Sequence, residues 1–185
     1  MIFDSVKMFL IITMERQQKL EPKYFGKRLK EHVHKALVEE VEGKCDPSFG
    51  FVVAVTKVHP ESIKLGKLEE YTGLAVFKIR YDCLVIKPEK GDIIDALVKE
   101  VIDDGILCSM GPLDIMVSQH NFDDDDHFAL SADKSAWVSE DKEVVIKERC
   151  VIRLKVVAVL YQNIRHIFTL GSIKGPFLGL LQNAE

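Results

Sequence analysis

From residue 92 to residue 172 the chain carries strand signals with no strong helix signal between them, which narrows its possible folds more than any other feature. The first two strands are joined by Asp103-Asp104-Gly105, a turn of the Asp-Gly type that is typical of a hairpin. The predicted strands are residues 92–102, 106–110, 113–117, 144–159 and 167–172, and the last two are expected to pair. Five short strands of this kind predict a small closed barrel, most commonly an OB-fold.

The first half of the chain contains a single helix signal. Leu29, Val33, Leu37 and Val41 recur every fourth residue among charged positions, which predicts an amphipathic helix that ends at Gly43. Strands are predicted at residues 8–13, 49–56 and 74–87, the second of them buried on both faces, and the polar residues 15–21 are expected to lie outside the first strand. The fold class is therefore α+β, with an RNP-like strand-helix-strands domain followed by the barrel.

Net charge argues at first against a nucleic-acid-binding protein. The 185 residues hold 25 Lys and Arg against 29 Asp and Glu, for a formal charge of −4. Much of the acidic excess, however, comes from an acidic insert at residues 121–142. Residues 144–174 hold six Lys and Arg against the single acid Glu148, so the last barrel strands are basic. RNA binding by the barrel therefore remains open.

Cysteine usage and hydropathy indicate the compartment. The four cysteines, Cys45, Cys83, Cys108 and Cys150, form no Cys-x-x-Cys pair, and no signal peptide is recognised at the start. Cys83 and Cys150 lie in apolar, strand-like surroundings and are expected to be buried free thiols, and the expected compartment is a reducing one, either cytoplasm or nucleus. No apolar run approaches the roughly 20 residues that span a bilayer, so no membrane association is expected.

No catalytic arrangement is recognised. His32 and His34 lie two residues apart on the predicted helix, on different faces, and cannot share a metal ion. The stretch from His120 to His127, with Asp123–Asp126 between them, has metal-like chemistry but lacks the Gly and Glu of a calcium loop, which favours a solvated loop. No phosphate-binding glycine loop or Gly-x-Ser-x-Gly motif occurs. We therefore expect no metal, no cofactor and no enzymatic activity.

A set of short motifs follows in order over residues 8–182. They are Met8-Phe9, Pro22-x-Tyr24-Phe25-Gly26, Glu40-Val41-Glu42-Gly43-x-Cys45, Phe49-Gly50-Phe51-Val52-x-Ala54-Val55, Gly66-x-Leu68, Tyr81-x-x-Leu84-Val85-x-x-Pro88-x-x-Gly91-Asp92, Gly111-Pro112, Val117-Ser118-x-His120, Ile152-Arg153-Leu154-Lys155, Ile167-x-x-Leu170-Gly171-Ser172 and Leu178-Gly179. In this ordered set the chain resembles the stalk-subunit family of RNA polymerase II, the seventh-subunit family, whose archaeal relative is the E-prime component of RNA polymerase.

The resemblance implies an organisation and partners. Residues 1–7 form an N-terminal extension, residues 8–81 an RNP-like tip domain, and residues 82–185 an OB-fold domain with the acidic insert. The family forms a stalk heterodimer with a smaller helical subunit in the nucleus, and its tip docks at the clamp base of the polymerase II core. The barrel contacts emerging single-stranded RNA. The expected core-binding residues are those of the tip loop: Gly66, Lys67, Leu68, Glu69, Glu70, Tyr71, Thr72 and Gly73.

RNA contacts on the barrel are expected from cations. The candidates are Lys99, Arg149, Arg153, Lys155 and Lys174. The positions where RNA-binding barrels carry stacking groups are Leu107 and Met116 here, so no stacking platform is expected. Binding through the cations alone should have a modest affinity that falls steeply with salt. The same cations are equally consistent with solvated strand faces. Phe128 and Trp137 of the insert are expected to cover one end of the barrel.

Three alternatives remain open at this point. The chain is also consistent with the equivalent stalk protein of another RNA polymerase, or with a free-standing single-stranded RNA-binding module in translation or mRNA decay. A metal-dependent enzyme built around residues 120–127 is a distant third.

Overall fold

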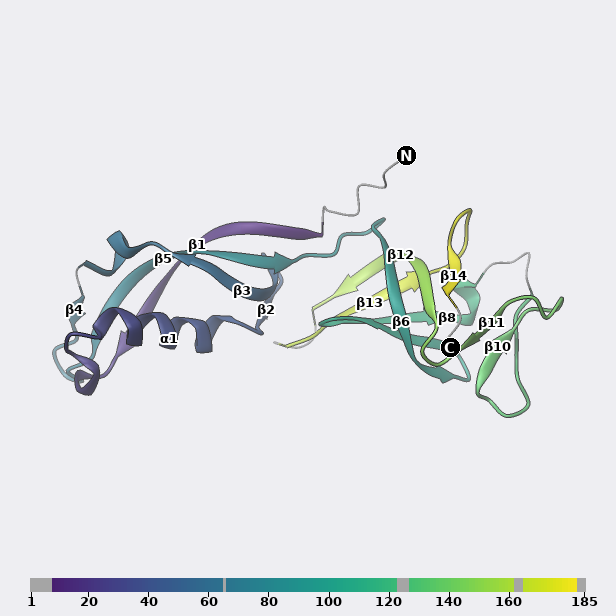
Figure 1. Cartoon of the computed structure of the whole chain (residues 1–185), viewed down its shortest axis with the longest axis horizontal. Helices are drawn as coiled ribbons and strands as arrows, with labels where there is room; N and C mark the ends of the chain where they lie inside the picture. Colours follow the sequence, from purple (N-terminus) through teal and green to yellow (C-terminus); the bar gives the residue numbers. More distant parts are fainter. Residues whose placement is uncertain (1–7, 65, 123–126, 162–164, 183–185) are drawn as a thin grey trace. The chain divides into compact units, whose positions relative to one another are not determined.

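The computed structural model describes residues 8–64, 66–122, 127–161 and 165–182. It divides into two compact units: a first unit of Phe9–Lys87, and a barrel unit that begins at Pro88 and also takes in Met8 (Figure 1). The expected domain boundary after residue 81 falls inside a strand of the first unit. The N-terminal extension, residues 1–7, lies outside the described residues. None of the described helices is long and apolar enough to cross a membrane.

The first unit is one antiparallel sheet with a helix on one face, as Figure 1 shows. The sheet order is β1-β5-β3-β2, and the short β4 pairs with β5 outside this path. Its elements are β1 (Phe9–Leu20), the 3-10 helix η1 (Pro22–Tyr24), α1 (Leu29–Val41), β2 (Cys45–Asp46), β3 (Gly50–Val58), η2 (Pro60–Lys64), β4 (Lys67–Leu68) and β5 (Ala75–Ile86).

The core of this unit lies between α1 and the sheet. Val33, Leu37 and Val41 of the helix are buried in one cluster with alternate residues of β5, among them Ile79 and Cys83. The four-residue spacing on the helix and the two-residue spacing on the strand thus place both apolar rows in one interface. The predictions of a helix from Leu29 to Val41 and of a strand at residues 74–87 are confirmed.

Two strand predictions in this unit were wrong, one in the extent of the strand and one in its burial. β1 runs from Phe9 to Leu20 and pairs with β5 along its whole length, so the polar residues do not end it. The reason is that Arg16, which faces the helix, forms an ion pair with Glu40 of α1, while Glu15, Gln17 and Lys19 point the other way. β3 is not buried on both faces, because only Gly50 and Val52 are buried in it.

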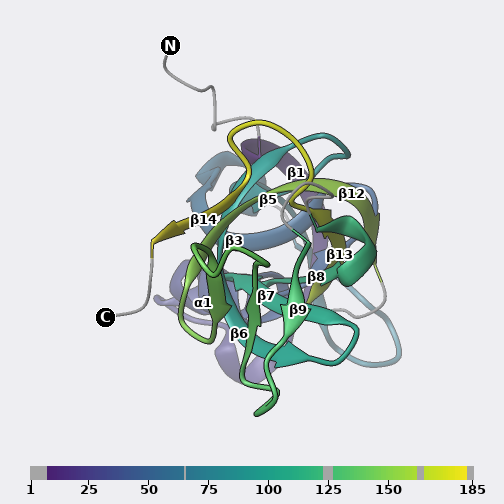
Figure 2. The same cartoon turned by 90° about the vertical axis from the view of Figure 1, so that its right-hand side faces the viewer.

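The barrel unit is a closed five-stranded barrel, which confirms the predicted OB-type fold. Its strands are β6 (Ile93–Ile102), β7 (Gly105–Met110), β8 (Leu113–Ser118), β12 (Val151–Leu160) and β13 (Ile167–Ser172). β6, β7 and β8 form an antiparallel meander, β8 pairs with β13 in parallel, and β12 closes the ring between β13 and β6. β14 (Gly179–Gln182) adds to β12 and lies at the periphery in Figure 2.

The acidic insert folds into a small structure of its own. β9 (Ala129–Leu130), β10 (Ala136–Val138) and β11 (Val145–Lys147) form a three-stranded sheet, preceded by the 3-10 helix η3 (Gln119–Asn121). The predicted strand 144–159 is therefore two strands, β11 and β12, separated by a turn in which Arg149 has a φ of 67°. Asp123–Asp126, the centre of the metal hypothesis, lie outside the described residues.

Trp137 of the insert attaches this sheet to the barrel, as expected. Its ring is buried, and its Nε1–H donates a hydrogen bond of 3.0 Å to the carbonyl of Gly105 at the start of β7. Phe122 lies edge-on to both Trp137 and Phe128, with ring centroids 5.2 and 5.4 Å apart. The three rings form one apolar cluster between the insert and the barrel.

Candidate nucleic-acid interface and tip loop

The outer face of β7 and β8, the second and third barrel strands, is the surface that OB-folds use for oligonucleotides, and β13 lies beside β8. Leu107 of β7 lies directly opposite Met116 of β8, and both are half-buried. The two positions at which RNA-binding barrels carry stacking groups thus form an apolar cross-strand pair in this barrel. Leu170 of β13 is the register partner of Met116 on the other side and extends this apolar surface.

An aromatic side chain on this face was missed in the sequence. Phe168 of β13 is half-buried, and its register partner is Asp114 of β8. Its neighbours Ile167 and Thr169 are fully buried, so Phe168 points outward from the barrel. The alternation of residues 167–172 is the signal that predicts this orientation.

Two of the five cations predicted to bind RNA are paired with aspartates. The Nζ of Lys99 on β6 lies 2.8 Å from Asp114 Oδ1, and His166 Nδ1 lies 3.5 Å from Asp114 Oδ2. Arg153 on β12 donates two hydrogen bonds, of 2.7 and 2.9 Å, to the carboxylate of Asp95 on β6. These hydrogen bonds raise the pKa of Arg153. An acidic neighbour therefore already balances each of these two charges.

The remaining three cations do not gather around the Leu107–Met116 pair. Arg149 is exposed in the turn before β12, and Lys155 is exposed on β12 opposite Ser172. Lys174 is half-buried beyond the end of β13. The structure therefore brings Arg153 and Lys155 together on one side of β12, and it separates them from Lys99, whose ammonium group pairs with β8.

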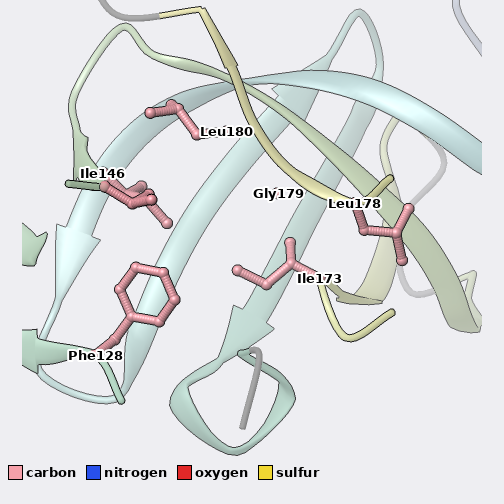
Figure 3. A pocket seen from close by; sticks show the side chains of 7 residues that line it. Phe128, Ile146, Ile173, Leu178, Gly179 and Leu180 are labelled. Carbon is pink, nitrogen blue, oxygen red and sulfur yellow. The ribbon is translucent and has the colours of Figure 1, made fainter. Parts of the chain in front are cut away.

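A small apolar pocket of about 150 Å³ lies elsewhere on the barrel unit, between β14, the insert and the end of β13. In Figure 3 the side chains of Phe128, Ile146, Ile173 and Leu180 surround it. Its lining side chains carry no charge or hydrogen-bonding group, so this pocket is unsuited to phosphate.

The predicted tip loop, residues 66–73, is an ordered hairpin of the first unit. Lys67 and Leu68 form β4 and pair with Val76 and Ala75 of β5. The backbone N–H of Glu69 donates to the carbonyl of Leu74 at 2.9 Å, and that of Gly73 to the carbonyl of Glu69 at 3.0 Å. Gly73 has a φ of 66°, which a glycine adopts without strain.

Side-chain contacts hold the turn of this hairpin. The hydroxyl of Thr72 donates a 2.7 Å hydrogen bond to Glu69 Oε2, and Lys19 of β1 lies 3.4 Å from Glu69 Oε1. The hydrogen bond from Thr72, followed by that from Lys19, lowers the pKa of Glu69. The loop is thereby tied to both its own turn and the neighbouring strand.

The hairpin presents two apolar side chains to solvent. Tyr71 is 97% exposed and Leu68 is 67% exposed. Gly66 lies against the ring of Phe77, where an added Cβ would come within 2.6 Å of a ring carbon, so the chain approaches the core closely just before the hairpin. An exposed tyrosine and leucine on a rigid turn are suited to protein contact.

Within the described ranges, no group of three His, Cys, Asp or Glu side chains is placed to hold a metal ion.

Comparison with known proteins identifies the family. Residues 19–73 match the model of the "SHS2 domain found in N terminus of Rpb7p/Rpc25p/MJ0397", and residues 87–171 match the "S1 RNA binding domain". The chain is 36% identical over 176 residues to "DNA-directed RNA polymerase II subunit 7" of Arabidopsis thaliana, which covers 95% of this chain and 98% of that protein. The chain belongs to the RNA polymerase II subunit 7 family.

Two further members of the RNA polymerase II subunit 7 family support the same assignment. The protein of Glycine max is 37% identical over 95% of this chain, and that of Saccharomyces cerevisiae is 31% identical over 94% of this chain and 100% of its own length. The family resemblance seen in the sequence motifs is therefore confirmed. So is the order of domains, with the SHS2 match in the first unit and the S1 match over the barrel.

Proposed function

We propose that this protein is a non-catalytic, nuclear subunit of RNA polymerase II. In this proposal it forms the stalk heterodimer with a smaller helical subunit, docks at the clamp base through the tip loop, and contacts emerging RNA through the barrel. The observation that carries the proposal is similarity along nearly the whole chain to proteins named RNA polymerase II subunit 7.

Docking through the tip loop is supported by its geometry. Tyr71 and Leu68 project from a hairpin that is held by the bonds around Glu69, so little conformational entropy is lost when a partner covers them. Aromatic anchors of this kind supply much of the binding energy of protein interfaces.

Binding of the smaller subunit is supported by the outer edge of β1 and by the sheet face opposite α1. β1 ends the order β1-β5-β3-β2, so its outer edge pairs with no described strand. On the face opposite α1, Ile11 is 70% exposed and Val53 of β3 is also exposed. An unpaired strand edge beside exposed aliphatic side chains is a surface on which a partner can add a strand or pack a helix.

The contact of the barrel with RNA is supported by its S1 match and by Phe168 on the outer face of β13. Because Lys99 and Arg153 are paired with aspartates, we expect modest affinity and a shallow salt dependence for this surface. If replacing Arg149, Arg153 and Lys155 by Ala changes neither the affinity nor its salt slope, β12 is not the RNA path.

Purification of the tagged full-length chain from its own cells tests the central claim. We expect the largest polymerase II subunits and one small helical partner to co-purify with it. The double variant Leu68→Ala/Tyr71→Ala should lower recovery of the core about tenfold or more, as expected for two interface anchors, while retaining the small partner. Phe177→Ala, which removes an exposed ring from the barrel unit, is the matched control.

The opposite outcome is equally specific. Recovery of the chain free of every polymerase subunit, with RNA binding intact, would instead assign it to the free-standing RNA-binding modules.

A further inference from the structure

The barrel unit has an open strand edge at β14. This strand ends the sheet order β13-β8-β7-β6-β12-β14, so its outer side pairs with no described strand, and it lies at the periphery in Figure 2. Natural proteins often protect such an edge with a charged residue or a proline. β14, with the sequence Gly-Leu-Leu-Gln, carries neither, and its Leu181 is 46% exposed. The edge is therefore suited to pairing with a further strand.

The apolar pocket of Figure 3 lies beside this strand. Gly179 and Leu180 of β14 line it, together with side chains that include Phe128, Val144 and Ile173. An apolar cavity of about 150 Å³ holds one small ring or aliphatic side chain. A Cβ added at Gly179 would meet no atom within 4 Å, so another backbone can approach β14 closely there. A strand added to β14 can therefore place one side chain in the pocket.

An acidic turn borders the pocket. The turn, residues 139–144, joins β10 to β11, and its last residue, Val144, lines the pocket. The backbone N–H of Ser139 donates a 3.0 Å hydrogen bond to the carbonyl of Val144, which closes the turn. Its three carboxylates are exposed and, in the part of the chain that the structure describes, form no ion pair: Glu140, Asp141 and Glu143. Within the turn, Lys142 alone opposes their charge.

Together these features specify the chemistry of a partner. The open edge requires an extended backbone, and the pocket requires one aliphatic or aromatic side chain at the position that faces it. The unpaired carboxylates of the acidic turn favour Lys or Arg beside that side chain. The same carboxylates repel phosphate, so RNA is disfavoured at this site.

We propose that β14, the pocket and the acidic turn form one docking site for an extended basic segment of a partner protein. The segment adds a strand to β14, inserts an apolar side chain into the pocket, and pairs its Lys or Arg with the acidic turn. The site goes beyond the proposed function, which assigns no partner to this part of the barrel unit, and either proposal can hold without the other.

Fluorescence anisotropy with the full-length chain and a labelled peptide tests strand addition. The probe is Lys-Lys-Thr-Leu-Thr-Leu-Lys-Lys, whose four central residues match the four residues of β14. Alternate N–H groups of a strand point to opposite sides, so N-methylation of either the two Thr or the two Leu should abolish binding, while N-methylation of the other pair should leave it. Equal effects of both modifications would contradict pairing with β14.

The pocket is tested from both partners. Replacing both Leu of the probe by Ala should lower the affinity about tenfold or more, because the pocket loses its apolar occupant. Val144→Phe fills the pocket from its own wall and should have an effect of similar size. Val157→Phe, which adds the same ring at an exposed position of β12, is the matched control and should bind like the wild type. Circular dichroism confirms that both variants are folded.

The acidic turn has its own pair of variants. Glu140→Gln/Asp141→Asn/Glu143→Gln should lower the affinity for the basic probe about threefold or more and make it less dependent on salt. The control Glu89→Gln/Glu100→Gln/Asp104→Asn removes the same charge from exposed positions of the barrel unit and should keep both values near those of the wild type.

Four results would overturn the proposal. The first is an unchanged affinity in Val144→Phe and in the acidic-turn variant. The second is displacement of the probe by an oligouridylate, which would make this an RNA surface. The third is self-association of the chain that Val144→Phe abolishes, which would assign the site to a second copy. The fourth is loss of polymerase subunits from purified Val144→Phe, which would make the site part of the polymerase assembly.

Failure of the proposed function gives a different result. If the chain purifies free of polymerase subunits while the probe binds as described, the proposed function is wrong and the docking site stands.

Discussion

Arg153 and Lys99 show how acidic residues on other strands of the same sheet set the effective charge of a side chain. Asp95 is the direct register partner of Arg153, and Asp114 reaches Lys99 from β8. Both aspartates lie outside residues 144–174, so the positive count of that stretch does not reveal that one of its cations is balanced. At the surface of the barrel these pairs matter more for RNA attraction than for stability, since exposed ion pairs contribute about 0–1 kcal/mol.

Removing these aspartates should strengthen RNA binding. In Asp95→Asn/Asp114→Asn the two cations become available to phosphates, and we expect a higher affinity for single-stranded RNA and a salt slope steeper by about 1.4. Anisotropy titrations against salt measure both. The control Asp133→Asn/Asp141→Asn changes net charge equally at exposed positions of the insert and should leave the slope near the wild type. Equal effects in both variants would contradict a local role for the pairs.

Thiol reactivity should separate one cysteine from the other three. Cys45 is partly exposed, whereas Cys83, Cys108 and Cys150 are buried, and burial raises the pKa of Cys108 to about 12. Because the thiolate is the reactive form, we expect a maleimide at pH 8 to label Cys45 of the folded chain first, read by mass spectrometry. Cys45→Ser should abolish this fast labelling. Labelling of Cys108 at the rate of Cys45 would contradict the buried assignment.

At the scale of single helices and strands, the sequence predicted those elements whose apolar residues recur at a regular spacing. The four-residue repeat from Leu29 to Val41 predicted α1, and the two-residue alternation within residues 74–87 predicted β5. β1 was underestimated, because the partner that accommodates Arg16 is Glu40, which follows it by 24 residues. The β9–β10–β11 sheet was missed, because an acidic composition masks strands of two or three residues.

Removing the hydrogen bond of Trp137 should show how much the contact between the insert and the barrel contributes to stability. Trp137→Phe keeps a ring beside Phe122 but leaves the Gly105 carbonyl without its donor, for which we expect a loss of about 1–3 kcal/mol in the free energy of unfolding. Urea unfolding followed by far-ultraviolet circular dichroism gives this value. Phe177→Leu, at an exposed position, should change it by no more than about 0.5 kcal/mol. An unchanged stability in Trp137→Phe would show that the insert does not depend on this bond.

At the scale of the whole molecule, the chain has two separate cores. Local signals and the family motifs predicted both the α+β class and the order of the domains. The parallel pairing of β8 with β13 and the aspartate partners of the cations depend on register between distant strands, which the spacing of residues within one strand does not encode. For this reason the candidate cations were named individually, but their grouping was not predicted.

Separate cores predict separate unfolding. Leu37→Ala, in the core of the first unit, should lower the stability of that unit by about 2–5 kcal/mol, and Ile115→Ala should do the same in the barrel unit. In differential scanning calorimetry of the full chain we expect two components, each shifted by only one of these variants. A single transition that both variants shift equally would show that the two units unfold together.

Under the proposed function, the pairing of Arg153 with Asp95 affects how long RNA would stay bound to the barrel. An incoming phosphate must displace a carboxylate that already makes two good hydrogen bonds, so the exchange yields little net free energy. If the barrel contacts RNA as proposed, we expect a strand that crosses this face to be released quickly. A short residence time would suit a surface over which growing RNA must move at every step of its synthesis, because tight binding there would slow elongation.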